Sequence, residues 1–325
     1  MDRLTHWRLK APDTAQAPLV DETGLRDLAF YAQSLPRSLL EFERHATHPL
    51  IGETLSLHRG RGFEFEENRV YQAGDESRLL NWRLYARTGE LYTKVFAEER
   101  RPQVLLLVDR RAAMRFATRS QLKAALAAKI AVCYAHQAQH QALAVGGLIL
   151  NQTAEWFGPA MGDSSLHALV QSVVAASPPL PFECDQADLD ESLQLLMHRL
   201  PGGSFVLLIS DFSGLDPDAA MPLLHQLATL HTVQAVQILD PVELRLPING
   251  DFLIEDGIED GAAPRPLRIH GRDGLQQTLY TEAFEERQQK LTTCFHSCGI
   301  PFKTCTTEDD VETCLGPSDA DTSAN

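Results

Sequence analysis

The run VLLLVD at residues 104–109 indicates a strand at the centre of a sheet. Short, continuous apolar runs of this kind are typical of strands that are buried on both faces, as in parallel sheets. Asp109 ends the run and would lie at the carboxyl end of the strand, the edge at which open α/β sheets place their ligands. Asp109 and the two residues after it, Arg110 and Arg111, are therefore the first candidates for a functional site.

Strands and helices alternate along the rest of the chain. A second apolar strand, Ser204–Ser210, also ends at a carboxylate, Asp211. The patterns predict further strands at 142–150, 155–157, 232–239 and 301–305, a hairpin at 252–254 and 267–269, and helices at 122–133, 166–174, 189–200, 217–230 and 276–295. The first of these helices has Thr118 or Ser120 as its expected N-cap. The alternation predicts an α/β fold in which helices flank a mostly parallel sheet.

The texture of the sequence divides the chain into successive parts. Residues 1–44 are irregular apart from a helix predicted at 24–35. Residues 45–101 form a small β-containing subdomain, with strands expected at 52–57 and 91–96. Residues 102–306 form the α/β domain, and residues 307–325 form a tail that we expect to be mostly disordered.

Charge is distributed unevenly along the chain. Of the net charge of −15, residues 111–325 account for −14, with 13 basic and 27 acidic residues. An acidic body disfavours general binding to nucleic acid or anionic membranes and suits a partner with a basic surface. No apolar run approaches the roughly 20 residues that span a bilayer, and the N-terminus lacks a signal-peptide pattern, so we expect a cytoplasmic protein without a transmembrane segment. The six cysteines form no CxxC pair and are interpreted as buried free thiols.

Residues 59–87 interleave arginines with aromatic residues, Trp82 among them. Such a pattern can bind single-stranded nucleic acid through stacking and charge. Acidic residues are equally dense in this segment, which favours a network of internal ion pairs instead. Trp82 is interpreted as a packing anchor.

The same segment carries an ordered series of motifs. They are Gly60-Arg61-Gly62-Phe63-Glu64-Phe65, Arg69-Val70-Tyr71-Gln72-Ala73-Gly74-Asp75, Arg78, Asn81-Trp82-Arg83, Ala86-Arg87 and Lys94-Val95-Phe96. With Leu107-Val108-Asp109, Leu208-Ile209-Ser210-Asp211-Phe212 and Leu239-Asp240-Pro241, they give the chain a resemblance, over roughly residues 45–305, to the bacterial family called "domain of unknown function fifty-eight". The signature residues that the resemblance implies are Arg61, Gly62, Glu64, Arg69, Tyr71, Gly74, Asp75, Arg78, Trp82 and Arg87. It also implies a von Willebrand factor A-like, or Rossmann-like, fold and a partnership with a MoxR-type AAA+ ATPase.

The resemblance further implies a candidate metal site, because von Willebrand factor A domains often carry a metal-ion-dependent adhesion site that begins with Asp-x-Ser-x-Ser. In this chain the matching positions are Asp109, Arg111 and Ala113, and Asp211 matches the later acidic position. Both serine ligands are missing, whereas hard divalent cations need several oxygen ligands. We therefore expect no cofactor; a divalent cation, if one binds, would use Asp109 and Asp211. Instead, Arg110 or Arg111 is expected to take the cation's position and pair with both carboxylates, since a guanidinium binds carboxylates bidentately.

Two main functions are open at this point. The first is a non-enzymatic adaptor in the maturation or assembly of client proteins, whose partner-binding rim consists of Asp109, Arg110, Arg111, Ser210 and Asp211. The second is a metal-dependent hydrolase that uses the carboxylates of Asp109 and Asp211. Nucleic-acid binding by residues 59–101 is a third interpretation, which steeply salt-dependent binding would reveal.

Overall fold

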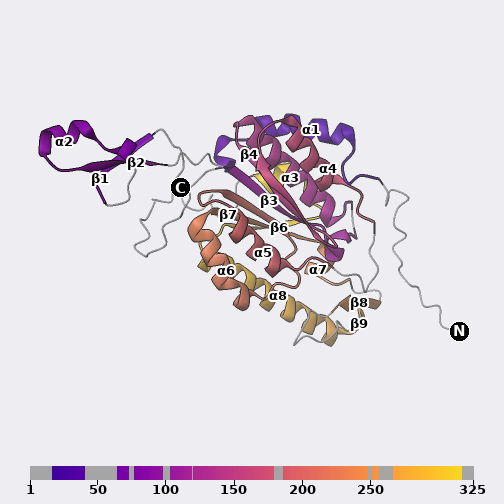
Figure 1. The fold of residues 1–325 in the computed structure, drawn as a ribbon. Coiled ribbons are helices and arrows are strands. Elements are labelled where there is room, and N and C mark those ends of the chain that lie inside the picture. Colours follow the sequence, from indigo (N-terminus) through magenta and orange to yellow (C-terminus); the bar gives the residue numbers. More distant parts are fainter. Residues whose placement is uncertain are drawn as a thin grey trace, which may run out of the picture. The chain divides into compact units, whose positions relative to one another are not determined.

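The computed structural model describes residues 17–40, 64–72, 77–97, 103–118, 120–178, 186–247, 251–255 and 266–316. The chain forms two compact units, one made of residues 46–101 and the other of residues 1–45 and 102–325 (Figure 1). The strand expected at 52–57 and the signature residues Arg61, Gly62, Gly74 and Asp75 lie outside the described residues.

The larger unit is built on a six-stranded sheet with the strand order β10-β7-β6-β3-β4-β5. Its strands are β3 (Gln103–Asp109), β4 (Ala144–Leu150), β5 (Ala154–Ala160), β6 (Phe205–Ser210), β7 (Thr232–Leu239) and β10 (Phe302–Thr306). Within this sheet, the edge strand β5 runs antiparallel to β4, and the other neighbouring pairs are parallel. The predicted α/β fold with a mostly parallel, Rossmann-like sheet is confirmed, and VLLLVD forms most of the inner strand β3.

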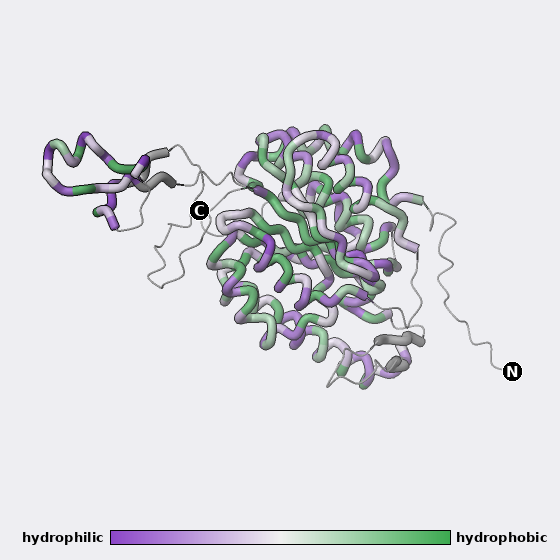
Figure 2. Tube along the Cα trace, viewed as in Figure 1, coloured by the Kyte–Doolittle hydropathy of each residue, from purple (hydrophilic) through white to green (hydrophobic). Residues whose placement is uncertain are grey.

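Helices cover both faces of this sheet (Figure 1). They are α1 (Glu22–Ser34), α3 (Lys123–His140), α4 (Asp163–Val174), α5 (Leu189–Arg199), α6 (Pro217–Leu230), α7 (Pro241–Leu244), α8 (Gly274–Ser297) and α9 (Val311–Leu315). One core cluster joins the sheet to α1, α3, α4 and α9, and a second joins it to α5, α6 and α8. Val104, Leu106 and Val108 belong to the first cluster, whereas Leu105 and Leu107 belong to the second. Because successive side chains of β3 enter different cores, the strand is apolar without alternation, and Figure 2 shows it within a hydrophobic band.

The order of the strands reverses between β3 and β6. From β3 the chain proceeds through β4 to β5 on one side, and from β6 through β7 to β10 on the other. Val108 pairs with Ile209, so Asp109 and Ser210 come next, side by side, at the carboxyl ends of the two strands. Open α/β sheets bind ligands at such a switch point, and the predicted rim therefore lies where the topology favours a site.

The expected N-cap of α3 is wrong. The helix begins at Lys123, and its N-cap residue, Leu122, provides no side-chain hydrogen bond. The hydroxyl of Ser120 instead donates to the carbonyl of Thr307 at 3.1 Å, and that of Thr118 donates to the carboxylate of Asp240. Both hydroxyls bond to groups beyond β7 and β10, a choice that local sequence cannot predict.

The smaller unit is a hairpin that carries a short helix. Strand β1 (Glu64–Val70) pairs antiparallel with β2 (Tyr92–Ala97), and helix α2 (Trp82–Thr88) lies between them in sequence. Asn81 caps α2 by accepting a hydrogen bond from the backbone N–H of Leu84, and its amide donates to the side chain of Asn68 at 2.7 Å. The predicted small β-containing subdomain is thus confirmed.

The described residues also include a second hairpin and several cysteines. The hairpin expected near residues 252–269 is formed by β8 (Asp251–Glu255) and β9 (Pro266–His270). No helix in this part of the chain has the length and apolar composition needed to cross a membrane. The cysteines that it contains are buried free thiols, as predicted, whereas Cys184 lies outside it.

Candidate functional site

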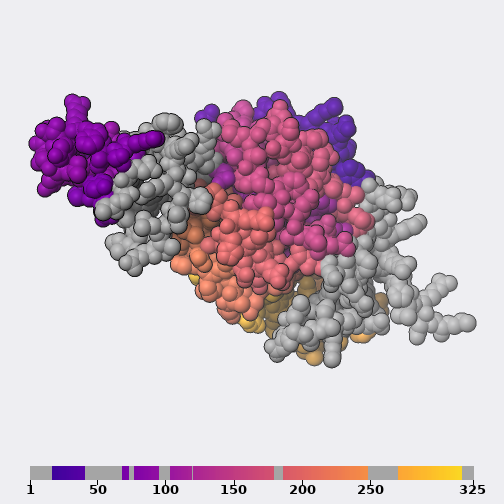
Figure 3. Space-filling view, in the orientation of Figure 1, coloured from indigo at the N-terminus to yellow at the C-terminus, as the bar shows by residue number. Residues whose placement is uncertain are grey.

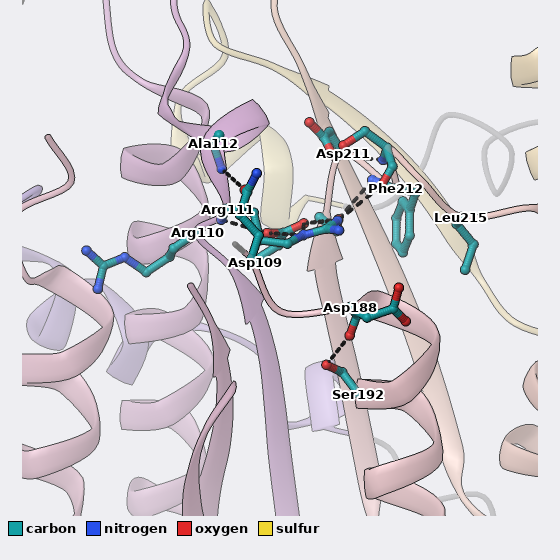
Figure 4. A network of polar contacts seen from close by, with 12 residues as sticks. Asp109, Arg110, Arg111, Ala112, Asp188, Ser192, Asp211, Phe212 and Leu215 are labelled. Atoms are coloured by element: carbon teal, nitrogen blue, oxygen red, sulfur yellow. Dashed lines mark hydrogen bonds and ion pairs between the residues drawn. The ribbon is translucent and has the colours of Figure 1, made fainter. Parts of the chain in front are cut away.

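Asp109 lies at the centre of the rim and is fully buried. Its Oδ2 accepts hydrogen bonds from Nη2 of Arg111 at 2.8 Å and from the hydroxyl of Ser210 at 2.6 Å. Its Oδ1 accepts from the backbone N–H and from Nε of Arg111, at 2.9 and 3.1 Å. Arg111 therefore folds back over the carboxylate that precedes it by two residues and grips both oxygens (Figure 4).

Arg111 also links the loop after β3 to the loop after β6. Its Nη2 donates to the carbonyl of Ser213 at 3.1 Å. Burial alone would lower the pKa of Arg111, but the charge and hydrogen bonds of Asp109 outweigh burial and raise it. The guanidinium is therefore a permanent cation at the switch point.

Asp211 is held by a second cation, Lys123. Nζ of Lys123 donates to Oδ2 of Asp211 at 2.9 Å and to Oε1 of Glu243 at 2.7 Å. The side chains of Lys123 and Asp211 are 1% and 4% exposed, so this ion pair is buried, whereas Glu243 is 28% exposed and faces the outside of the cluster. The backbone N–H of Ser213 bonds to the second oxygen of Asp211 at 2.9 Å.

The charges of this cluster shift one another's pKa values. Burial alone would raise the pKa of Asp211, but Lys123 and the bond from Ser213 lower it below its usual value. For Lys123, burial would lower the pKa, and the two carboxylates raise it above its ordinary range. For Glu243 the effect of burial prevails over that of Lys123, and the pKa rises. Lys123 and Asp211 are therefore both charged at neutral pH.

Glu243 is positioned by the start of α7. It forms a capping box with Asp240, in which Oε2 of Glu243 accepts from the backbone N–H of Asp240 at 2.7 Å. The carboxylate of Asp240 in turn accepts from the backbone N–H groups of Val242 and Thr118, and from the hydroxyl of Thr307 at 2.9 Å. Burial would raise the pKa of Asp240, but these hydrogen bonds lower it.

Arg110 points away from the rim (Figure 4). Its Nη2 donates to the carbonyls of Ala175 and Ala176, at 2.6 and 3.0 Å, and to the hydroxyl of Ser177 at 2.7 Å, beyond the carboxyl end of α4. Burial and then the charge of Arg115 lower its pKa to about 10. The hypothesis assigned one arginine to both carboxylates, but the structure divides that role between Arg111 and Lys123.

Sequence reasoning missed Lys123. Its position was visible in the pattern, because Lys123 shares a helical face with Leu126 and Ile130, three and seven residues further on, and that face is buried. A lysine at the start of an apolar stripe needs a buried acceptor. The sequence did not show which carboxylates supply it, since Asp211 and Glu243 come from distant segments.

The outer part of the rim is acidic. Asp188 and Asp216 are the N-caps of α5 and α6, where each accepts a backbone hydrogen bond. Burial, followed by the charges of Asp188 and Asp216, raises the pKa of Asp190. The rim therefore combines a neutralised interior with a negative border.

A cavity of about 220 Å³ adjoins this rim beside β7 and α8. Its lining includes Asp211, Glu243, Tyr280 and Arg287. Arg287 closes one side by donating to the carbonyl of Phe212 at 2.8 Å. Burial and the charge of Glu243 raise the pKa of Tyr280 to about 12, so the hydroxyl of Tyr280 stays protonated around neutral pH.

The donor set of this rim does not fit the divalent cation of an adhesion site. Arg111 and Ala113 stand where the family resemblance would place the two serine ligands, and both carboxylates already bind cations of the chain. Among the described residues, no group of three or more histidines, cysteines, aspartates or glutamates is arranged to hold a metal ion. A guanidinium and an ammonium thus take the carboxylate oxygens that a metal ion would use.

The described signature residues all belong to the smaller unit. Glu64 and Arg69 lie in β1, and Tyr71 follows that strand. Arg78 precedes α2, and Arg87 lies in the last turn of α2. The interpretation of Trp82 as a packing anchor is wrong, because this side chain is 60% exposed.

The family comparison gives a match to more than half of the chain. Residues 67–268 match the family model described as "Protein of unknown function DUF58". The chain is 28% identical over 262 residues to uncharacterised proteins of Mycobacterium bovis and Mycobacterium tuberculosis, covering 80% of this chain and 80% of each relative.

Two solved structures match this chain over most of their own length. One is an aerotolerance-related membrane protein from Bacteroides fragilis, 11% identical with a TM-score of 0.42, for which the match covers 66% of this chain and 94% of that chain. The other is the conserved hypothetical protein BatB from Bacteroides thetaiotaomicron, 12% identical with a TM-score of 0.32, with coverage of 60% and 99%.

Proposed function

Because this chain belongs to the DUF58 family, whose function is unknown, we propose that it is a non-enzymatic interaction module that binds a protein partner through the rim at the carboxyl ends of β3 and β6. The proposal rests on one observation, that cationic side chains of the chain itself neutralise both carboxylates of the rim. Arg111 neutralises Asp109, and Lys123 neutralises Asp211.

The groups that could perform chemistry at the rim are already engaged. The hydroxyl of Ser210 is buried, donates to Asp109 and accepts from the backbone N–H of Phe212 at 2.8 Å. The acceptor of its proton, the carboxylate of Asp109, is paired with Arg111, and this pairing makes it a weak base for activating a nucleophile. The rim is better suited to presenting a fixed surface than to turning over a substrate.

In this proposal the rim is a degenerate metal-ion-dependent adhesion site. The two serine positions are occupied by Arg111 and Ala113, and the guanidinium of Arg111 supplies the positive charge beside Asp109. Titration calorimetry with Mg²⁺ and Mn²⁺ should give no stoichiometric binding at micromolar concentrations. Binding at that affinity would contradict the degenerate site.

The border of the rim supports a partner that presents basic side chains. Asp188, Asp190 and Asp216 give this border its negative charge, and opposite charge on a partner speeds and orients association. The family resemblance suggests a MoxR-type AAA+ ATPase as this partner, with the chain acting as an adaptor for client proteins. The proposal therefore places the chain in the cytoplasm, where such an ATPase finds its nucleotide.

The alternative is a metal-dependent hydrolase that uses Asp109 and Asp211. Both carboxylates would first have to release Arg111 and Lys123, and separating a buried ion pair costs about 3–5 kcal/mol. Metal-dependent hydrolysis that is lost in both Asp109→Asn and Asp211→Asn variants would favour this alternative.

A charge-removal variant of the border tests the proposed partner. Asp188→Asn/Asp216→Asn removes two charges but keeps side chains that can cap α5 and α6. We expect the wild type to bind a MoxR-type ATPase from the same organism and to change its ATPase rate, and the variant to bind several-fold more weakly. Asp21→Asn, which neutralises the N-cap of α1, is the matched control. An ATPase that neither binds nor responds to the wild type would contradict the proposed partner.

A further inference from the structure

Helix α2 of the smaller unit displays two large aromatic rings to solvent. Trp82 is 60% exposed and Tyr85 is 43% exposed. The rings pack edge to face with centroids 6.2 Å apart, so they form one continuous apolar surface rather than two isolated side chains. The helix lies on the surface of this unit in the space-filling view (Figure 3).

Three exposed arginines lie in or just before this helix. Arg78, Arg83 and Arg87 are exposed, and none forms an ion pair in the part of the chain that the structure describes. Apart from Glu90, the acidic side chains of this unit lie outside the described residues, so the predicted network of internal ion pairs stays a prediction. Arg83 and Arg87 are four residues apart on one face of α2, an arrangement in which like charges repel. A partner with negative charge would relieve this repulsion.

The surface is also held in shape before any partner binds. Asn81 caps the start of α2 and bonds to Asn68 of β1, and Gly89 ends the helix at a φ of 75°, which glycine adopts without strain. The backbone N–H of Asn81 donates to the carbonyl of Tyr92 at 2.8 Å, which fixes the helix to β2. A preformed surface loses little conformational entropy on binding.

From these observations we infer that α2, with Trp82, Tyr85 and the guanidinium groups of Arg78, Arg83 and Arg87, is a docking surface for a carboxylate-rich protein segment. Tryptophan, tyrosine and arginine are the residues that dominate binding energy in protein interfaces. The two rings would pack on apolar atoms of the segment, and the guanidinium groups would bind its carboxylates.

A protein segment fits this surface better than a nucleic acid does. The small unit as a whole is neutral, with nine basic and nine acidic residues between 46 and 101, and the whole chain carries −15. A nucleic-acid strand needs positive charge along its length, which a unit without net charge does not provide, whereas a short acidic segment needs only the patch itself. The surface is independent of the rim, because its residues belong to the other compact unit.

The test uses the fluorescence of Trp82 in the full chain, with Trp7 and Trp156 replaced by phenylalanine. The probe is a synthetic glutamate-rich peptide, with its glutamine counterpart as a control peptide and an oligo-dT strand as the nucleic-acid probe. We expect Trp82 to be quenched by acrylamide in the free protein and to be shielded by the glutamate-rich peptide alone. Higher salt should weaken the binding.

Two variants identify the groups responsible. The affinity for the glutamate-rich peptide should fall by about tenfold or more in Arg83→Glu/Arg87→Glu and in Trp82→Ala. The first variant is measured through the fluorescence of Trp82, and the second by calorimetry. Arg272→Glu, which changes an exposed arginine of the larger unit, should leave the affinity unchanged.

The inference is overturned if Trp82 is already shielded in the free protein, or if the glutamate-rich peptide fails to bind. Tighter binding of oligo-dT than of the peptide would assign the surface to nucleic acid and also overturn it. Concentration-dependent self-association lost in Arg83→Glu/Arg87→Glu would assign it to a second copy of the chain. A protein that does not bind the peptide could still bind the ATPase through the rim. The peptide assay therefore tests the surface of α2, and the ATPase assay tests the rim.

Discussion

Replacement of Lys123 by methionine should destabilise the larger unit more than any exposed substitution. Methionine keeps an unbranched apolar side chain but removes the ammonium group that lies 2.9 Å from Asp211 and 2.7 Å from Glu243. Asp211 would then be a charge with 4% side-chain exposure and no counterion. Breaking one side of a buried ion pair costs about 3–5 kcal/mol. The partly exposed Glu243 adds little, because water can replace its lost partner.

A double-mutant cycle separates the ion pair from the packing. Asp211→Asn in the Lys123→Met background removes the unpaired charge, so the double variant should be more stable than the sum of the single changes predicts, with a coupling energy of about 2–3 kcal/mol. Urea unfolding followed by circular dichroism at neutral pH measures all four proteins. Lys129→Met is the matched control, since Lys129 lies in the same helix but is only partly buried and bonds to Gln121. The reasoning is refuted if Lys123→Met costs no more than Lys129→Met, or if the cycle shows no coupling.

Further predictions concern the same rim and its supports. The variant Arg111→Ser/Ala113→Ser restores the missing hydroxyls, and calorimetry should detect Mg²⁺ or Mn²⁺ binding that the wild type lacks; equal behaviour of the two proteins would count against a degenerate adhesion site. Arg110→Met removes several hydrogen bonds to the segment after α4 and should lower the free energy of unfolding by about 2–4 kcal/mol, whereas a loss below about 0.5 kcal/mol would show that this buried charge is not stabilising. Because the pKa of Asp211 is lowered in the folded state, its contribution to stability is complete above the unfolded value of about 3.9 and is lost as the pH falls through the folded value. The urea midpoint of the wild type should therefore fall more steeply below about pH 4 than that of Lys123→Met/Asp211→Asn, and parallel curves would contradict this assignment.

The sequence predicted those parts of the fold that depend on local pattern. The strands β3 and β6 were identified because uninterrupted apolar runs leave few alternatives. Asp109, which ends β3, and Asp211, which follows β6, were identified with them. Helix α6 was predicted at the bounds that the structure shows, since Asp216 and Pro217 mark its start and its apolar face is regular.

The contacts between distant segments could not be predicted in this way. Lys123 bonds to residues that are 88 and 120 positions away, and no local rule selects them. Thr118 is a residue type that often caps helices, but in the folded chain its hydroxyl donates to Asp240, which is 122 positions away. Trp82 was misjudged for a different reason, because the size of its side chain suggests burial, whereas the structure leaves it 60% exposed on a short helix.

The pairing of Asp109 with Arg111 has a consequence for how the rim responds to its surroundings. The counterion of Asp109 is attached to the same backbone two residues away, so it cannot be diluted, chelated or exchanged. A contact made through this surface would persist in the presence of chelators and would not follow changes in cellular magnesium. The rim would behave as a constant feature of the molecule, and any regulation of its contacts would have to come from the partner or from the acidic border.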